Sequence, residues 1–72
     1  MEYNLKLREL REKKRLSQRA LAAKINVTPG AVAKWELGYT MPTLENLIAL
    51  VNLLDCTADQ LLGRDGAGQT TA

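Results

Sequence analysis

The sequence has no histidine, a single cysteine and no long run of apolar residues. The absence of histidine excludes imidazole acid-base chemistry, and a lone cysteine permits neither an internal disulfide nor a structural zinc site. A membrane helix needs about 20 apolar residues, and the charged N-terminus MEYNLKLREL is unlike a signal peptide. We therefore expect a cytoplasmic protein with no metal, no cofactor, no membrane partner and no evident small-molecule ligand.

The 72 residues suffice for one domain with a thin stability margin and little room for an active-site cleft. The net charge of +2 is unevenly divided. Residues 1–36 hold nine Lys and Arg against four Glu, and residues 37–72 hold one Arg against four Asp and Glu. The positive half favours a polyanionic partner. The alternative is that Lys13, Lys14 and Arg15 only form a solvated helix end, where cations complement the helix dipole.

Hydrophobic spacing and capping residues predict an all-α domain of five helices without a strand. The first helix is predicted from about Asn4 to Lys14, and the second ends near Ile25. The third stops before Gly38, which suits a left-handed C-terminal position, and the last ends at Gly63. The side chains predicted to cap the later helices are Ser17, Thr28, Thr43 and Thr57, the last in a capping box with Gln60.

The fourth helix is predicted to be buried on two sides. Leu50 and Leu53 form its second apolar strip. This strip either packs against the last helix or serves as a dimer interface, and we favour packing against the last helix. Residues 1–62 are predicted to form the domain, and the Gly-rich residues 63–72 a flexible tail. The first apolar face of the fourth helix is predicted to comprise Leu44, Leu47, Ile48, Val51 and Leu54.

The most informative stretch is QRALAAKINVTPGAVAKWEL, in which two short helices are joined by a tight turn at Asn26. The sequence resembles the phage-repressor and Cro-type helix-turn-helix domains of the XRE-like family over residues 7–62. The resemblance is carried by this stretch, the preceding Leu-Ser, the following Gly38 and the later Pro42-Thr43-Leu44. The resemblance implies a five-helix, lambda-repressor-like fold and a transcriptional regulator, with repression expected, that binds double-stranded DNA sequence-specifically. A homodimer is expected, at least on DNA, with half-sites about 34 Å apart.

In such domains the second helix of the motif, here Thr28 to Glu36, lies in the major groove. Val32 and Trp35 are predicted to face the core, which puts a small and bland surface outward. Positions that often carry Gln or Ser in the family hold Pro, Gly and Ala, so direct readout is expected mainly from Lys34 and Thr28, supplemented by DNA shape. A phosphate contact by Lys34 is an equally open alternative. The predicted base-reading residues are Thr28, Pro29, Gly30, Ala31 and Lys34.

The resemblance also implies phosphate contacts and one ion pair. Arg11 and Glu36 match positions of a partly buried pair that links the first helix to the recognition helix. Arg15 departs from the family, which often has Gly there, so a positive φ at Arg15 would carry strain. The residues expected to contact phosphate, with Gln18 at the start of the second helix foremost, are Ser17, Gln18, Arg19, Tyr39 and Thr40.

Two further classes of function are a protein-interaction module and an enzyme. A protein-interaction module, such as an antitoxin-like or anti-repressor partner, keeps the fold and is favoured by the bland surface of Pro29, Gly30 and Ala31. An enzyme is not predicted, because no cluster brings an acid, a base and a nucleophile together. Cys56 is expected to be a small buried hydrophobe and Trp35 a core residue.

Overall fold

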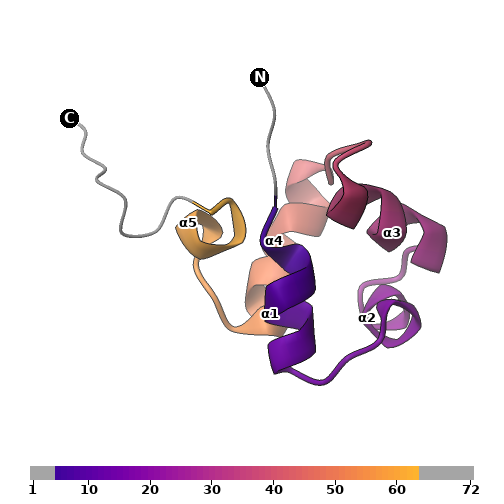
Figure 1. Cartoon of the computed structure of the whole chain (residues 1–72), viewed down its shortest axis with the longest axis horizontal. Helices are drawn as coiled ribbons and strands as arrows, with labels where there is room; N and C mark the ends of the chain where they lie inside the picture. The colour runs from indigo at the N-terminus through magenta and orange to yellow at the C-terminus, as the bar shows by residue number, and fades with distance from the viewer. Residues whose placement is uncertain (1–4, 64–72) are drawn as a thin grey trace.

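The computed structural model describes residues 5–63, whose helices pack around one core, and Figure 1 shows how the helices are arranged. Within these residues there are five α-helices and no strand, as predicted. α1 and α4 cross in the middle, with α2 and α3 on one side and α5 on the other (Figure 1). The helices are α1 (Leu7–Lys13), α2 (Gln18–Lys24), α3 (Pro29–Leu37), α4 (Leu44–Leu54) and α5 (Ala58–Leu61).

The first helix begins later than the sequence predicts. α1 starts at Leu7, and Lys6 at its N-cap makes no side-chain capping bond. The backbone N–H of Lys6 instead donates to the carbonyl of Leu61 at 2.8 Å, so this segment pairs with α5 and does not extend the helix. The predicted start at Asn4 and most of the predicted tail, residues 64–72, lie outside the described residues.

The other helix starts are confirmed. Each cap residue accepts a hydrogen bond from the backbone N–H three residues later, which satisfies one of the free donors of the first turn. Gln60 also accepts from the backbone N–H of Thr57 at 2.9 Å, which completes the capping box. These caps are Ser17, Thr28, Thr43 and Thr57.

The core takes side chains from all five helices. Trp35 is 5% exposed, which confirms its predicted place in the core. Ala22 is buried where α2 packs against α3, so its small size allows the two helices to approach closely. The largest fully buried side chains are Leu7, Leu21, Val32, Leu50 and Leu61.

The predicted two-sided burial of α4 is wrong. Leu44 and Ile48 are 73% and 51% exposed, whereas Leu50 is fully buried. With 100° per residue, Ile48 lies about 200° around the helix from Leu50 and therefore faces away from the core. Leu53 is half-buried and packs against the core, so the packing interpretation of Leu50 and Leu53 holds. The residues of α4 that face the core are Leu47, Leu50, Val51, Leu53 and Leu54.

Among residues 5–63, three residues other than glycine have a left-handed backbone. Asn26 has φ 63°, as the sequence predicts, and Arg15 has φ 58°, the conformation in which a residue with a Cβ carries strain. Asp55, at the C-cap of α4, has φ 55° and was not predicted. Gly38 and Gly63 have φ 84° and 75°, and they end α3 and follow α5 without the steric cost of a Cβ.

Within residues 5–63, no helix combines the length and the apolar character needed to cross a membrane.

Candidate nucleic-acid interface

The turn between α2 and α3 fixes the angle at which the second helix leaves the first. Ile25 caps α2, and Asn26 then takes the left-handed conformation. The N–H of Val27 donates back to the carbonyl of Ala22 at 2.9 Å, which closes the turn. Thr28 caps α3, and Pro29 occupies its first turn, where the missing N–H breaks no helical hydrogen bond.

α3 presents its first turn and one long face to solvent. Thr28, Pro29, Gly30 and Lys34 are exposed, while Val32 and Trp35 are buried beneath them. Ala31 differs from the other predicted base-reading residues, because it is half-buried and packs against the core. The Thr28 hydroxyl accepts from the Ala31 N–H at 3.1 Å, which fixes its orientation at the start of the helix.

The predicted pair of Arg11 and Glu36 is formed and lies inside the protein. Arg11 Nε donates to Glu36 Oε2 at 2.6 Å, and Arg11 Nη2 donates to Oε1 at 3.2 Å. The two side chains are 10% and 6% exposed. Arg11 Nη1 also donates to the Leu16 carbonyl at 2.8 Å, so the guanidinium joins α1, the segment before α2 and the last turn of α3.

The surroundings of Glu36 favour its charged form. Burial by itself raises the pKa of this carboxyl, but hydrogen bonds from Arg11 and Gln18 and the charge of Arg11 outweigh burial, so the pKa is lowered from its ordinary value of 4.5. The hydrogen bond to Glu36 raises the pKa of Arg11. Both groups therefore remain ionised at neutral pH, and neither charge is left uncompensated.

Gln18 belongs to this network. Its Nε2 donates to Glu36 Oε1 at 2.9 Å, so its amide nitrogen is held against α3. The sequence predicted Gln18 as a phosphate contact and did not predict this bond. In the structure the amide links the start of α2 to the end of α3.

A surface cavity of about 500 Å³ lies over this network. Ser17 and Gln18 from the start of α2 and Ala33 from the outer face of α3 line it together. The structure thus brings two predicted phosphate-contact residues next to the exposed face of the recognition helix. The remaining lining residues are Arg8, Arg11, Glu36 and Leu37.

Arg8 is a cavity residue that the sequence analysis missed. Its Nε donates to Glu12 Oε2 at 3.2 Å in an exposed pair, and it lies three residues before Arg11 on α1. Residues three apart lie on the same face of a helix, so Arg8 could have been predicted to lie near the recognition helix from the predicted position of Arg11.

The other predicted phosphate-contact residues lie apart from the cavity. Arg19 is exposed on α2, and Tyr39 and Thr40 are exposed in the segment that follows α3. The N–H of Tyr39 donates to the Lys34 carbonyl at 2.9 Å, which fixes where this segment leaves the helix. None of these residues takes part in the Glu36 network, and Tyr39 and Thr40 follow directly after the Gly38 cap of α3.

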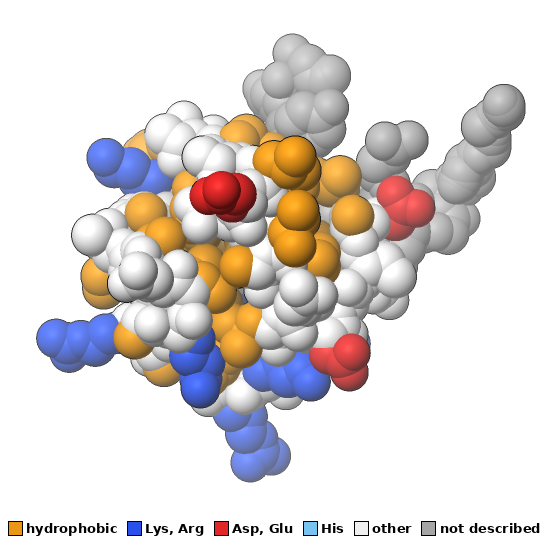
Figure 2. Space-filling view, turned by 180° about the vertical axis from the view of Figure 1, so that it is seen from behind, with side chains coloured by type: hydrophobic (Ala, Val, Ile, Leu, Met, Phe, Trp, Pro, Cys, Tyr) orange, Lys and Arg blue, Asp and Glu red, His pale blue; other side chains and the backbone are white. Residues whose placement is uncertain are grey.

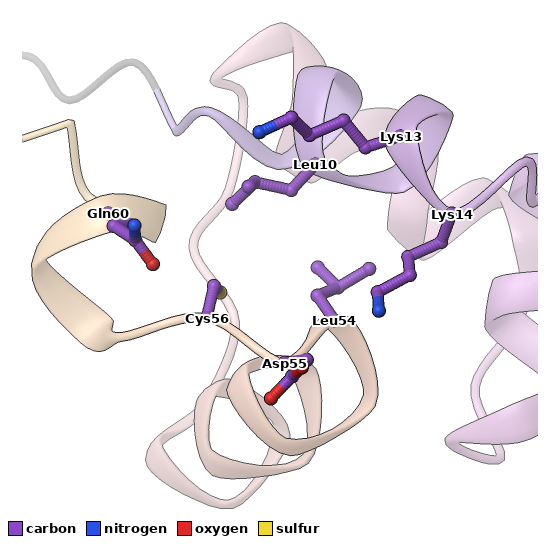
Figure 3. Close-up of a pocket in the computed structure, with 7 residues that line it drawn as sticks. All are labelled: Leu10, Lys13, Lys14, Leu54, Asp55, Cys56 and Gln60. Atoms are coloured by element: carbon purple, nitrogen blue, oxygen red, sulfur yellow. The ribbon is translucent and has the colours of Figure 1, made fainter.

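A second surface cavity of about 340 Å³ lies between α1, α4 and α5, where Leu10 and Leu54 lie on either side of it (Figure 3). Cys56 is half-buried there, and burial together with the charge of Asp55 raises the pKa of its thiol. A raised pKa disfavours the thiolate, which is the nucleophilic form of cysteine. Within residues 5–63, no group of three or more Cys, Asp and Glu is placed to hold a metal ion.

An apolar surface remains in water around the end of α3 and on α4. Figure 2 shows hydrophobic side chains gathered on the face of the molecule where α4 lies. Leu44 and Ile48 are four residues apart and share one face of α4. The exposed large apolar residues are Leu37, Tyr39, Met41, Leu44 and Ile48, and we call them the apolar patch.

A capped helix pair with a left-handed turn, inside a bundle of five helices, defines the phage-repressor and Cro-type helix-turn-helix domain. The model of the Helix-turn-helix family matches residues 7–61, and the chain belongs to that family. The HTH-type transcriptional regulator AnsR of Bacillus subtilis is 42% identical over 65 residues, which are 90% of this chain and 56% of AnsR. The chain spans about half the length, or less, of the curated relatives it matches.

Two solved structures bear on function. The c2 repressor of Salmonella phage P22, in complex with a synthetic operator, is 38% identical with a TM-score of 0.78 over 83% of this chain and 91% of that chain. The hydroxypropylphosphonic acid epoxidase from S. wedmorenis is 32% identical with a TM-score of 0.71 over 78% of this chain and 30% of that chain. The same fold thus occurs in a repressor and as part of an enzyme.

Proposed function

We propose that this chain binds double-stranded DNA sequence-specifically and regulates transcription, as a repressor, with α3 in the major groove. The observation that carries the proposal is the similarity to an operator-bound repressor, combined with an exposed first turn on α3. A helix fits the major groove, where base edges carry a distinct pattern of donors, acceptors and methyl groups. A bacterial or phage operator in the cytoplasm is the corresponding target.

Within this proposal, Lys34 supplies the strongest base contact. Its side chain is exposed on α3 and reaches guanine O6 and N7, while Thr28, Pro29 and Gly30 lie against neighbouring base edges. Ala31 contributes less, because it packs partly against the core. The short side chains of this turn favour modest direct readout with a further contribution from DNA shape.

Phosphate contacts then hold the domain in register. Ser17 and Gln18 lie beside the cavity next to α3, and Arg8 adds a positive charge there. Arg19 on α2 and Tyr39 and Thr40 after α3 are exposed and complete the set. Such contacts supply affinity and salt dependence but carry no sequence information directly.

We further propose that two copies bind together on DNA through the apolar patch. The patch holds five large apolar side chains that are 46–74% exposed, far fewer than the roughly 20–30 residues a side of a stable interface. A stable interface needs about 800 Å² from each partner. The patch alone therefore favours a weak dimer, which half-sites on one duplex would complete.

The test of DNA binding is titration against a random-sequence duplex pool across a salt series, followed by sequencing of the retained duplexes. We expect steep salt dependence and an enriched two-fold-symmetric site. A base-substitution scan of that site with Lys34→Ala is expected to lose preference at one position of each half-site. If the variant keeps the base preference of the wild type at every position, Lys34 contacts phosphate and does not read a base.

The dimer is tested by sedimentation of the wild type and Leu44→Glu, with and without the selected duplex. We expect two copies of the wild type on one duplex and one copy of the variant, because a charge in the apolar patch opposes association. Ala23→Glu, an exposed substitution on α2, is the matched control. Two bound copies of Leu44→Glu would place the dimer contact elsewhere.

The second candidate function is a protein-interaction module without catalytic activity, and the apolar patch is the observation that favours it. Its signature is the absence of duplex retention even at low salt. A catalytic role for this domain is not proposed, since the raised pKa of the Cys56 thiol opposes nucleophilic chemistry in the cavity that contains it.

A further inference from the structure

The cavity between α1, α4 and α5 is lined by side chains from these three helices and from the segment that joins α4 to α5. Figure 3 shows them around an open centre, and the cavity has a volume of about 340 Å³. That volume is near the lower end for small-molecule sites, so the cavity suits a small ligand. No sequence motif indicates such a site, because its residues are spread from Leu10 to Gln60.

Part of the lining is apolar and incompletely covered. Leu54 belongs to the core, and Leu10 and Cys56 are half-buried side chains packed against it. Burial and the charge of Asp55 raise the pKa of the Cys56 thiol, so this side chain is neutral at physiological pH and adds no charge to the cavity. An apolar ligand body placed against Leu10 and Leu54 removes apolar surface from water, which is favourable.

The charged side chains at this cavity carry a surplus of one positive charge. Lys13 and Lys14 border it from the end of α1, and Asp55 borders it from the end of α4. Within residues 5–63, neither lysine takes part in an ion pair. Cations here also complement the dipole of α1, but that effect does not need a cavity beside them. The surplus favours a ligand with one negative charge over a ligand with two.

Gln60 offers a directed hydrogen-bond donor at the same cavity. Its Oε1 accepts from the backbone N–H of Thr57 at 2.9 Å, which fixes the orientation of the amide. Its Nε2 donates to no acceptor among the described residues of the chain, and Figure 3 shows the amide turned toward the open centre. A carboxylate oxygen accepts from such an amide, and a lysine ammonium on its flexible stem reaches the same group.

We propose that this cavity binds a small organic monoanion, namely a carboxylate with an apolar body. Lys13, Lys14 and Gln60 hold the carboxylate, while the apolar body lies against Leu10 and Leu54. This site lies on the side of the bundle opposite α2 and α3 (Figure 1), so the inference goes beyond the proposed function and does not depend on DNA binding.

The experiment uses Cys56 as the reporter and octanoate as the probe. Cys56 is the single cysteine of the chain, so its alkylation by a maleimide is read at this cavity alone. We expect octanoate to slow the alkylation of the wild type in a saturable manner, which gives a Kd. Acetate lacks the apolar body and is expected to give no protection at the same concentrations. Octanamide lacks the charge and is expected to need about tenfold more, because each exposed ion pair contributes up to about fivefold.

Charge variants test the two lysines. The double substitution Lys13→Gln and Lys14→Gln is expected to raise the Kd of octanoate about tenfold and to leave that of octanamide unchanged. Both side chains are exposed, so the variant is expected to fold and to be alkylated at the wild-type rate without ligand. Lys24→Gln is the matched control, since Lys24 is exposed on α2 and lines neither cavity, and its Kd is expected to equal that of the wild type.

A second control separates this site from the apolar patch. Leu44→Glu is expected to bind octanoate as the wild type does, and loss of protection in this variant would place the ligand on the patch and overturn the site. Absence of protection at any octanoate concentration would also overturn it. Equal protection by octanamide and octanoate, or an equal loss in Lys24→Gln, would overturn recognition of the anion. None of these results bears on DNA binding, which the duplex pool tests separately.

Discussion

Arg11 and Glu36 are 25 residues apart in the chain, yet their side chains meet through hydrogen bonds of 2.6 and 3.2 Å. The pair joins α1 to the last turn of α3, and both side chains are largely shielded from water. A buried pair of this kind is weak evidence for net stability, but it strongly penalises the removal of one partner. Its effect is to fix the position of the recognition helix on the rest of the domain.

The first prediction follows from this arrangement. Glu36→Ala is expected to lower the free energy of unfolding by about 3 kcal/mol, because the Arg11 charge would stay buried without a partner. Glu12→Ala, which removes the exposed partner of Arg8, is the control and is expected to cost under about 1 kcal/mol. Denaturant unfolding measures both. A near-neutral Glu36→Ala would contradict the buried pair.

The second prediction concerns pH. The pKa of Glu36 is lowered in the folded protein, so its contribution is fully present above the ordinary value of 4.5 and is lost as pH falls through the folded pKa. Urea unfolding from pH 7 down to pH 2 is expected to show the loss in the wild type. Glu36→Gln is expected to show a smaller loss, so the two curves converge at low pH, and parallel curves would exclude a lowered pKa.

The third prediction concerns backbone strain. Arg15 has φ 58°, and the left-handed conformation is costly for most residues with a Cβ. Arg15→Gly is expected to raise the free energy of unfolding by about 1 kcal/mol. Arg15→Ala removes the same charge but keeps the Cβ, and is expected to give no gain. Equal stabilities of the two variants would attribute any change to the charge alone.

The fourth prediction separates two cations of α1. Arg8 borders the cavity beside α3, whereas Lys13 borders the cavity near α5. Arg8→Ala is expected to weaken binding to all duplexes alike and to reduce the salt slope by about one. Lys13→Ala removes the same charge and is expected to leave the slope unchanged. Similar slopes for the two variants would remove Arg8 from the phosphate contacts.

The starts of α2, α3, α4 and α5 were predictable because caps are local. Ser17, Thr28, Thr43 and Thr57 each bond to the N–H three residues later, and this spacing is visible in the sequence. The turn at Asn26 was predictable for the same reason, since few residue types tolerate a positive φ.

The exposed face of α4 and the start of α1 were not predictable. Seven of the eleven residues of α4 are Leu, Ile or Val, so spacing alone does not show which of them face the core. The late start of α1 depends on a bond between Lys6 and Leu61, which are distant in sequence. Gln18 shows the same limit at the site, because its partner Glu36 lies on another helix.

The bond between Lys6 and Leu61 also has a mechanical consequence. It brings the two ends of the described chain together beside α5, on the other side of the bundle from α3 (Figure 1). The domain is therefore close to a closed ring, which a short linker from residue 63 to residue 5 would complete. A domain or label attached at that junction would be carried on the side of the bundle remote from α3.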